Sequence, residues 1–220
     1  MNKNTRNIGS GAMNLIYKKT LAIIVSCILI LFTNLSAQAA SLGTLSYWYS
    51  DSTTIERWDT HSLTVRAVKL DTLAVFSFNV SLTHACDQWK VPLGLSLYVT
   101  SSTSAPISYY GGTRQALNNL SIFPTIYSGV NGGTINTSYQ EGTYSYGATT
   151  KTGNVITSSI GYIVDNNRTN NEYKETCTHE LGHALGWYGH SSNWNSIMYA
   201  YGSSLTILTY IDKNHLAQVY

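Results

Sequence analysis

Charged side chains are scarce in this sequence, and the basic ones are unevenly placed. Of 220 residues, 13 are Lys or Arg and 11 are Asp or Glu. All four charges within residues 1–39 are basic, so residues 40–220 keep nine basic against eleven acidic side chains, a net charge of −2. Nucleic acids and anionic membranes are bound by clusters of Lys and Arg. No such cluster remains, and we expect no nucleic-acid partner.

The sequence also has no apolar run long enough to span a bilayer, which requires about 20 residues. Its longest run, Leu21–Phe32, follows two lysines and precedes a stretch of small residues. Basic residues, a short apolar core and small residues in this order are typical of a secretory signal peptide. We predict that residues 1–39 form this signal, with cleavage after Ala39 and Met13 as an alternative start. The protein is then secreted, without a stable membrane anchor.

Cysteine is nearly absent from the remaining chain, where Cys86 and Cys177 stand alone. Exported proteins meet oxidising conditions, which favour pairing of the two. A bridge closing about 91 residues would stabilise the fold by about 4–5 kcal/mol. Two separate buried thiols are the alternative.

Residues 40–220 are rich in Tyr, Ser, Thr, Asn and Gly, which is typical of β-structure joined by polar loops. Apolar alternation predicts strands at 45–49, 63–68, 93–99, 145–150 and 155–164, with a turn at 151–154. Three-to-four spacing and end signals predict helices late in 75–89 (ending before Pro92), at 114–120, at 172–185 and at 212–219. Residues 101–135 are otherwise expected to be turns. This order predicts one mixed α/β or α+β domain.

The predicted helix at 172–185 has clear end signals. A cluster of turn-forming residues, Asp165–Asn171, precedes it, and Thr169 with Glu172 matches a capping box. Gly186 stands where a left-handed residue ends a helix. The oxygen-bearing side chains of 165–171 also fit a calcium site, but a solvated turn that caps the helix is the interpretation we favour.

The chemistry is concentrated on this helix. His179 and His183 lie four residues apart, so both imidazoles share one face and reach a single metal ion. Glu180 lies too far around the helix to join them as a ligand, but it reaches a water at the metal's open position. Zinc lowers the pKa of such a water towards ~7, and a neighbouring carboxylate takes its proton. The pattern therefore predicts a zinc hydrolase with Glu180 as general base.

The residues that follow extend the pattern. The sequence HELGHALG (179–186), followed by GHS (189–191) and IMY (197–199), resembles the metzincin zinc peptidases, and within them the matrixins, the matrix metalloproteinases and their bacterial relatives. The resemblance implies an α+β, zincin-like single domain over residues 40–220, with a twisted mixed sheet, an active-site helix and a backing helix. It also implies that residues 147–165 hold the edge strand, with substrate pairing near 147–150, and the strand before the active-site helix.

The same resemblance assigns roles to individual residues. His190 is the third zinc ligand, Met198 forms the Met-turn beneath the metal, and Tyr199 and Tyr201 line the pocket for the substrate residue after the scissile bond. An ordinary core methionine is the alternative for Met198, and His215 is the rival for the third ligand.

Four features depart from the matrixin pattern. Gly189 occupies the family's position for the third histidine, so His190 comes one residue late, an insertion that a positive φ at Gly189 would absorb. No histidine lies between Cys86 and Cys177, so we expect no structural zinc. Too few residues follow Ala39 for the usual propeptide. Ala200 also replaces the family's proline after the Met-Tyr pair, which changes the pocket.

We therefore predict a secreted, monomeric zinc endopeptidase that binds one catalytic Zn²⁺ and acts on protein or peptide substrates. Two alternatives stay open. One is a catalytically silent exported binding protein that keeps the zincin fold. The other is a zinc hydrolase that acts on a non-peptide amide such as a cell-wall component.

Overall fold

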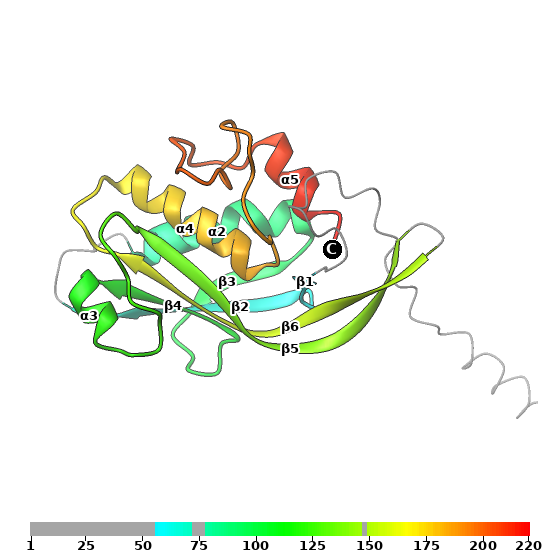
Figure 1. The fold of residues 1–220 in the computed structure, drawn as a ribbon, viewed down its shortest axis with the longest axis horizontal. Helices are drawn as coiled ribbons and strands as arrows, with labels where there is room; N and C mark the ends of the chain where they lie inside the picture. The colour runs from blue at the N-terminus through cyan, green and yellow to red at the C-terminus, as the bar shows by residue number, and fades with distance from the viewer. Residues whose placement is uncertain (1–55, 72–77, 147–148) are drawn as a thin grey trace, which may run out of the picture. The chain divides into compact units, whose positions relative to one another are not determined.

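A computed structural model describes residues 56–71, 78–146 and 149–220 of the chain (Figure 1). The predicted signal peptide, its cleavage site and the strand expected at 45–49 lie outside these ranges. Within them, no helix has both the length and the apolar character needed to cross a membrane.

The domain is built on a sheet in which all strands but one run parallel. The strands are β1 (Glu56–Arg57), β2 (Ser62–Lys69), β3 (Ser96–Thr100), β4 (Ile107–Gly112), β5 (Gly132–Tyr146) and β6 (Thr149–Val164). Their order is β1-β6-β4-β2-β3, and β5 pairs antiparallel with β6. The fold class is therefore mixed α/β with a mostly parallel sheet, which is compatible with the predicted α+β class.

Strands β5 and β6 form one long hairpin, and here two predictions were wrong. The turn expected at 151–154 is strand, because Thr152 pairs with Thr143 and Asn154 pairs with Glu141. The strand expected at 145–150 was also wrong: Tyr146 ends β5 and Thr149 begins β6, and residues 147–148 lie outside the described ranges. The strand beside β6 begins at Gly132. β-Branched threonines continue the strands through residues whose composition suggests a turn.

The central strand β4 was not predicted, although it pairs with both β2 and β6. Pro106 before it and Gly111-Gly112 at its end gave the segment the composition of a turn. The glycines have a packing reason instead. A Cβ at Gly111 would lie 2.9 Å from ring carbons of Phe78, so the missing side chain lets the first turn of α2 approach the strand.

Two long helices cover one face of the sheet: α2 (Phe78–Leu93) and α4 (Asn170–Ala184), which pack against each other (Figure 1). Their buried sides form the main core with β2, β4 and β6. Helix α2 passes through Pro92, contrary to the prediction that it ends before this residue. The proline stands in the last turn, so it removes one i→i−4 hydrogen bond at the very end of the helix, and Gly94 with φ 64° follows the helix end.

Shorter helices complete the fold. Helix α3 (Arg114–Asn118) confirms the helix expected at 114–120, and its Leu117 belongs to a smaller core cluster with Val164. Tyr109 and Tyr110 belong to the large and the small cluster, so the two clusters lie on opposite faces of the sheet. Helix α5 (Tyr210–Leu216) begins two residues before the final helix that was predicted.

The ends of α4 form as the sequence predicts. Thr169 and Glu172 make the complete capping box, with the Thr169 backbone N–H donating to Glu172 at 2.7 Å. Leu185 caps the C-terminal end, and Gly186 follows with φ 108°. A Cβ at Gly186 would collide with the backbone oxygen of Glu56. The helix that carries the candidate site is thus fixed at both ends.

Candidate metal centre

Three histidines converge beside the C-terminal half of α4. His179 and His183 are one turn apart on the helix, and His190 returns to them from the following loop. One ligand nitrogen from each ring lies within 4.8 Å of the other two, and this is the only such group of His, Cys, Asp or Glu in the described ranges. The three residues predicted as metal ligands are therefore close enough to bind one ion.

Backbone carbonyls fix where two of these rings carry their protons. Nδ1 of His179 lies 2.8 Å from the oxygen of Ile197, and Nδ1 of His183 lies 2.8 Å from the oxygen of Trp187. A carbonyl oxygen only accepts, so each neutral ring holds its proton on Nδ1 and leaves a lone pair on Nε2. The two Nε2 atoms are 3.2 Å apart. Two unprotonated nitrogens that face each other in this way are arranged for a shared cation.

Burial also keeps the rings neutral. It lowers the pKa of His179 to about 4, and, together with the neighbouring His179, it lowers the pKa of His183 to about 3. The pKa of His190 is lowered by the same cause. Neutral imidazole is the form that binds metals, so near pH 7 all three histidines are ready to bind.

The one-residue shift of His190 is absorbed locally. Gly189 has φ 73°, a conformation that side-chain-bearing residues rarely adopt, as predicted for an insertion at this point. The rival ligand His215 is fully buried on α5, where its ring centroid lies 3.8 Å from that of Trp187. It does not belong to the histidine group.

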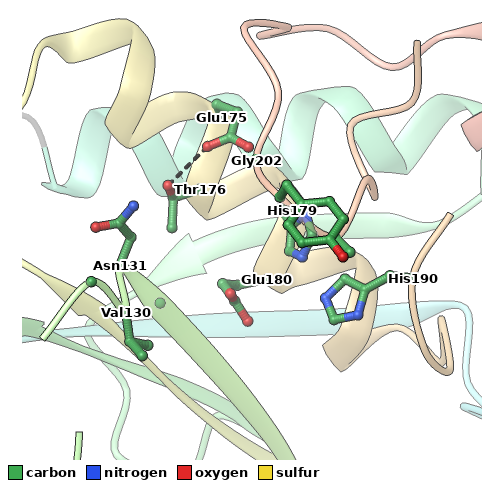
Figure 2. Close-up of a pocket in the computed structure, with 12 residues that line it drawn as sticks. Val130, Asn131, Glu175, Thr176, His179, Glu180, His190 and Gly202 are labelled. Atoms are coloured by element: carbon green, nitrogen blue, oxygen red, sulfur yellow. Dashed lines mark hydrogen bonds between the residues drawn. The ribbon is translucent and has the colours of Figure 1, made fainter. Parts of the chain in front are cut away.

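Glu180 points into the pocket beside the histidines (Figure 2). Its side chain is 7% exposed, and burial raises its pKa to about 8. The hydroxyl of Thr134 donates a hydrogen bond to Glu180 Oε2 at 2.8 Å, which partly offsets the effect of burial. A Cβ at Gly132 would lie 2.9 Å from the Glu180 side chain, so the glycine at the start of β5 makes room for it.

A row across the sheet supports Thr134. Tyr109 on β4, Gly161 on β6 and Thr134 on β5 stand in register. The fully buried Tyr109 extends over Gly161, and its hydroxyl lies 2.9 Å from Thr134 Oγ1. Sequence reasoning missed Thr134 and Tyr109, because their contact with Glu180 depends on strands that had not been located.

Met198 packs against α4 at Gly182, the residue before the second helical ligand. It is fully buried, and its Sδ would lie 2.6 Å from a Cβ at Gly182, so this glycine admits the thioether. The turn before it is fixed by the buried Asp212, which accepts hydrogen bonds from Ser196 Oγ and from the backbone N–H of Ile197. No sequence pattern had assigned this anchoring role to Asp212.

A pocket of about 370 Å³ opens on one side of the histidine group (Figure 2). Helix α4 contributes Glu175, Thr176, His179 and Glu180 to its lining. The segment before and at the start of β5 contributes residues 129–132, and the loops after α4 contribute His190 and residues 200–202. Of the two tyrosines expected here, Tyr201 lines the pocket, whereas Tyr199 makes an edge-to-face contact with Tyr201, with ring centroids 5.5 Å apart.

The structure has Cys86 and Cys177 as free, buried thiols in the main core, so the disulfide considered from the sequence is not formed in it. Burial raises the pKa of Cys86 to about 12 and that of Cys177 further. Two buried thiols match the alternative stated above.

Two of the side-chain oxygens in the turn considered for calcium accept hydrogen bonds from the protein. Asp165 accepts from the hydroxyl of Tyr173, and Asn166 Oδ1 accepts from the guanidinium of Arg168. A fixed positive charge within the cluster opposes a second cation. The favoured interpretation, a turn that caps α4, fits these contacts.

Neither a comparison with known protein families nor a search of curated proteins gave a match for this chain.

Proposed function

We propose that this chain is a secreted zinc-dependent endopeptidase with a zincin-like, matrixin-type domain. The observation that carries the proposal is the pair of Nε2 lone pairs of His179 and His183, 3.2 Å apart, with His190 beside them and the carboxylate of Glu180 in the adjoining pocket. The resemblance of residues 179–199 to the metzincins supports the same assignment.

The donor set fits zinc better than calcium or magnesium. Three imidazoles and one open position are the usual arrangement of a catalytic zinc site, whereas calcium and magnesium prefer oxygen ligands. The backbone carbonyls that orient the His179 and His183 rings are the outer contacts expected around such a site. When bound, zinc acts as a Lewis acid that activates water and the substrate carbonyl.

Glu180 supplies the proton transfers. With a cation held by the three histidines, the pKa of this carboxyl would fall below about 8, so that near pH 7 Glu180 would be ionised and able to accept a proton. Thr134 holds Oε2, which leaves Oε1 free to take the proton of the attacking water. Glu180 then donates that proton to the leaving amine.

The substrate would lie along β5. Among the described strands, β5 pairs with β6 alone, and its first residue, Gly132, lines the pocket. An extended peptide that adds to the edge of β5 would pass beside the histidines by β-augmentation. This moves the expected pairing site from 147–150 to the start of β5. A peptide bound along a strand edge is cut internally, which favours an endopeptidase.

The test combines metal analysis with proteolysis. The purified protein should bind one equivalent of zinc and cleave a mixed peptide library, and a chelator should abolish cleavage until zinc is restored. Glu180→Gln should retain zinc and lose at least about 100-fold in kcat, the usual contribution of a general base. Asp87→Asn, at an exposed acid on α2 away from the proposed substrate path, is the matched control. Failure to bind zinc, or unchanged cleavage by Glu180→Gln, would refute the proposal.

A further inference from the structure

The pocket beside the metal centre contains an acidic side chain that the proposed mechanism does not use. Glu175 stands one turn before His179 on α4, so the two side chains share a face of the helix about 6 Å apart along its axis. Both line the same pocket, whose volume of about 370 Å³ falls at the lower end of the roughly 300–1,000 Å³ typical of small-ligand sites. When one part of a ligand lies at the histidines, Glu175 is therefore within reach of the adjacent part of the same ligand.

Two hydrogen bonds fix the Glu175 carboxylate in place. Oε1 accepts from the backbone N–H of Ser203 at 3.1 Å, and Oε2 accepts from the hydroxyl of Thr176 at 2.9 Å (Figure 2). The first bond ties the carboxylate to the loop whose residues 200–202 form the opposite wall. A carboxylate offers about four acceptor sites, so two hydrogen bonds leave it able to bind a further donor.

Glu175 makes no direct ion pair within the described part of the chain. Its side chain is 8% exposed, and the two ion pairs found there lie elsewhere, at Arg57–Asp59 and Lys90–Asp87. Arg168 acts on it only through Thr176, whose hydroxyl accepts from the guanidinium and donates to the carboxylate; its charge lowers the pKa of Glu175 in part, but Arg168 does not line the pocket. Burial raises the pKa of Glu175, which reflects the cost of an ionised carboxylate without a full counter-charge.

The rest of the lining suits a cation as well. Apart from the neutral histidines, the only ionisable side chains besides Tyr201 that line the pocket are the carboxyls of Glu175 and Glu180. Tyr201, 88% exposed at the rim, offers an aromatic face of the kind on which ammonium and guanidinium groups stack. A long, positively charged side chain fits the volume of this pocket and its acidic lining.

We infer that this pocket binds the side chain of lysine or arginine at the substrate residue that follows the cleaved bond, with Glu175 as its counter-charge. The inference rests on the proposed peptidase function and names its substrate class. A purely structural Glu175, which clamps the loop through Ser203, predicts loss of activity on every substrate instead.

Two peptides that differ at one position test it. Both have the same sequence, taken from a library product, with lysine or norleucine after the cleaved bond, because norleucine has a similar chain without the charge. For the zinc-loaded wild type, kcat/KM should be about tenfold or more higher for the lysine peptide, as expected for a desolvated charge pair. In Glu175→Gln, which keeps the shape of the side chain, the ratio should fall to about one. Asp87→Asn, an equal change of charge at an exposed site on α2, should keep the wild-type ratio.

The outcomes separate the two proposals. If zinc-loaded wild type cleaves neither peptide nor library, the peptidase function and the inference both fail. If it cleaves without preferring lysine or arginine after the bond, the inference alone fails. The same holds if Glu175→Gln loses activity on both peptides equally. Zinc content and circular dichroism verify that the variant is folded, and if it is not, the residues enriched after the cut in the wild-type library decide the question.

Discussion

The hydroxyl of Thr134 has a single hydrogen, and this fixes the direction of the hydrogen bonds around Glu180. The ionised carboxylate and the backbone carbonyl of Glu180 only accept, so Thr134 directs its hydrogen to Glu180 Oε2 at 2.8 Å and to the carbonyl oxygen at 3.0 Å. Tyr109 must then donate its own hydrogen to Thr134 Oγ1. Tyr109 is fully buried, and burial raises its pKa well above the ordinary value. It therefore stays protonated and keeps donating. The chain ends on the proposed base and restrains which of its oxygens faces the pocket.

Thr134→Val should impair catalysis through Glu180 without touching the metal ligands. Loss of a hydrogen bond to a charged group should lower kcat about tenfold. Because this bond lowers the pKa of Glu180, its removal should raise the pKa of the base and move the acidic limb of the kcat–pH profile to higher pH. Steady-state kinetics over a pH series measures both effects.

Two further variants distinguish this role from a general loss of structure. Thr134→Ser keeps the hydroxyl and should retain most of the activity. Thr83→Val, the same change at an exposed position on α2, should leave both kcat and the pH profile unchanged. A profile that does not move in Thr134→Val would show that the hydroxyl does not tune Glu180.

Which side chains could be predicted from the sequence depends on how their chemistry is encoded. His179, Glu180 and His183 lie in one helical turn, so their spacing alone brings them together. The approach of His190 could be predicted for two reasons. The resemblance to the metzincins indicated a loop that returns to the helix, and Gly189 can adopt the positive φ that the extra residue in this loop requires. Thr134 contacts Glu180 across 46 residues of sequence, and Glu175 is notable only because of the pocket around it. Such contacts exist only in the folded chain.

Among the secondary-structure elements, the row that joins β4, β6 and β5 links the sheet to the site. Tyr109 reaches Thr134 because Gly161, between them, has no side chain. Gly161→Ala would place a Cβ inside the Tyr109 ring and force it to move. We expect the free energy of unfolding to fall by about 1–3 kcal/mol, as for other overpacked cores. We also expect a loss of kcat in the same direction as in Thr134→Val.

Urea unfolding and peptide kinetics measure these two effects, and Ser158→Ala, a half-buried position on the same strand, is the control. If Gly161→Ala is destabilised but fully active, Tyr109 stabilises the sheet without helping to position Glu180, and this prediction is wrong.

The elements themselves were predicted unevenly, for a physical reason. Strand β2 and helix α4 have regular apolar patterns or clear caps, and both are where the sequence places them. Strand β4 has Gly111 and Gly112, which read locally as a turn but serve a tertiary contact with Phe78. The hairpin of β5 and β6 extends through polar residues whose pairing decides their conformation. Where neighbours on other strands determine the structure, local composition gives the wrong answer.

For the domain as a unit, the buried histidines make stability depend on pH. Burial lowers the pKa of His183 to about 3 and those of His179 and His215 to about 4, and it lowers the pKa of His190 as well. In the unfolded chain each titrates near 6.5. Between these values the unfolded state binds more protons, so stability is present above pH 6.5 and is lost as the pH falls towards 4. Glu180 and Glu175 oppose this, since burial raises both of their pKa values.

In the metal-free protein, four histidines reduce stability on acidification and two carboxyls increase it, so we expect a net loss of stability. We expect the free energy of unfolding to fall between pH 6.5 and 4.5 with a slope on the order of 1–3 kcal/mol per pH unit, since each proton of difference contributes about 1.4.

Zinc should raise stability at pH 7 by about 4 kcal/mol at a thousandfold excess over its Kd. It should also steepen the loss, because protons compete for the same nitrogens. Urea unfolding of chelator-treated and zinc-loaded protein across this range measures both. A flat or rising stability on acidification would mean that the histidines are already protonated in the fold, which contradicts the tautomers that make Nε2 of His179 and His183 available for metal.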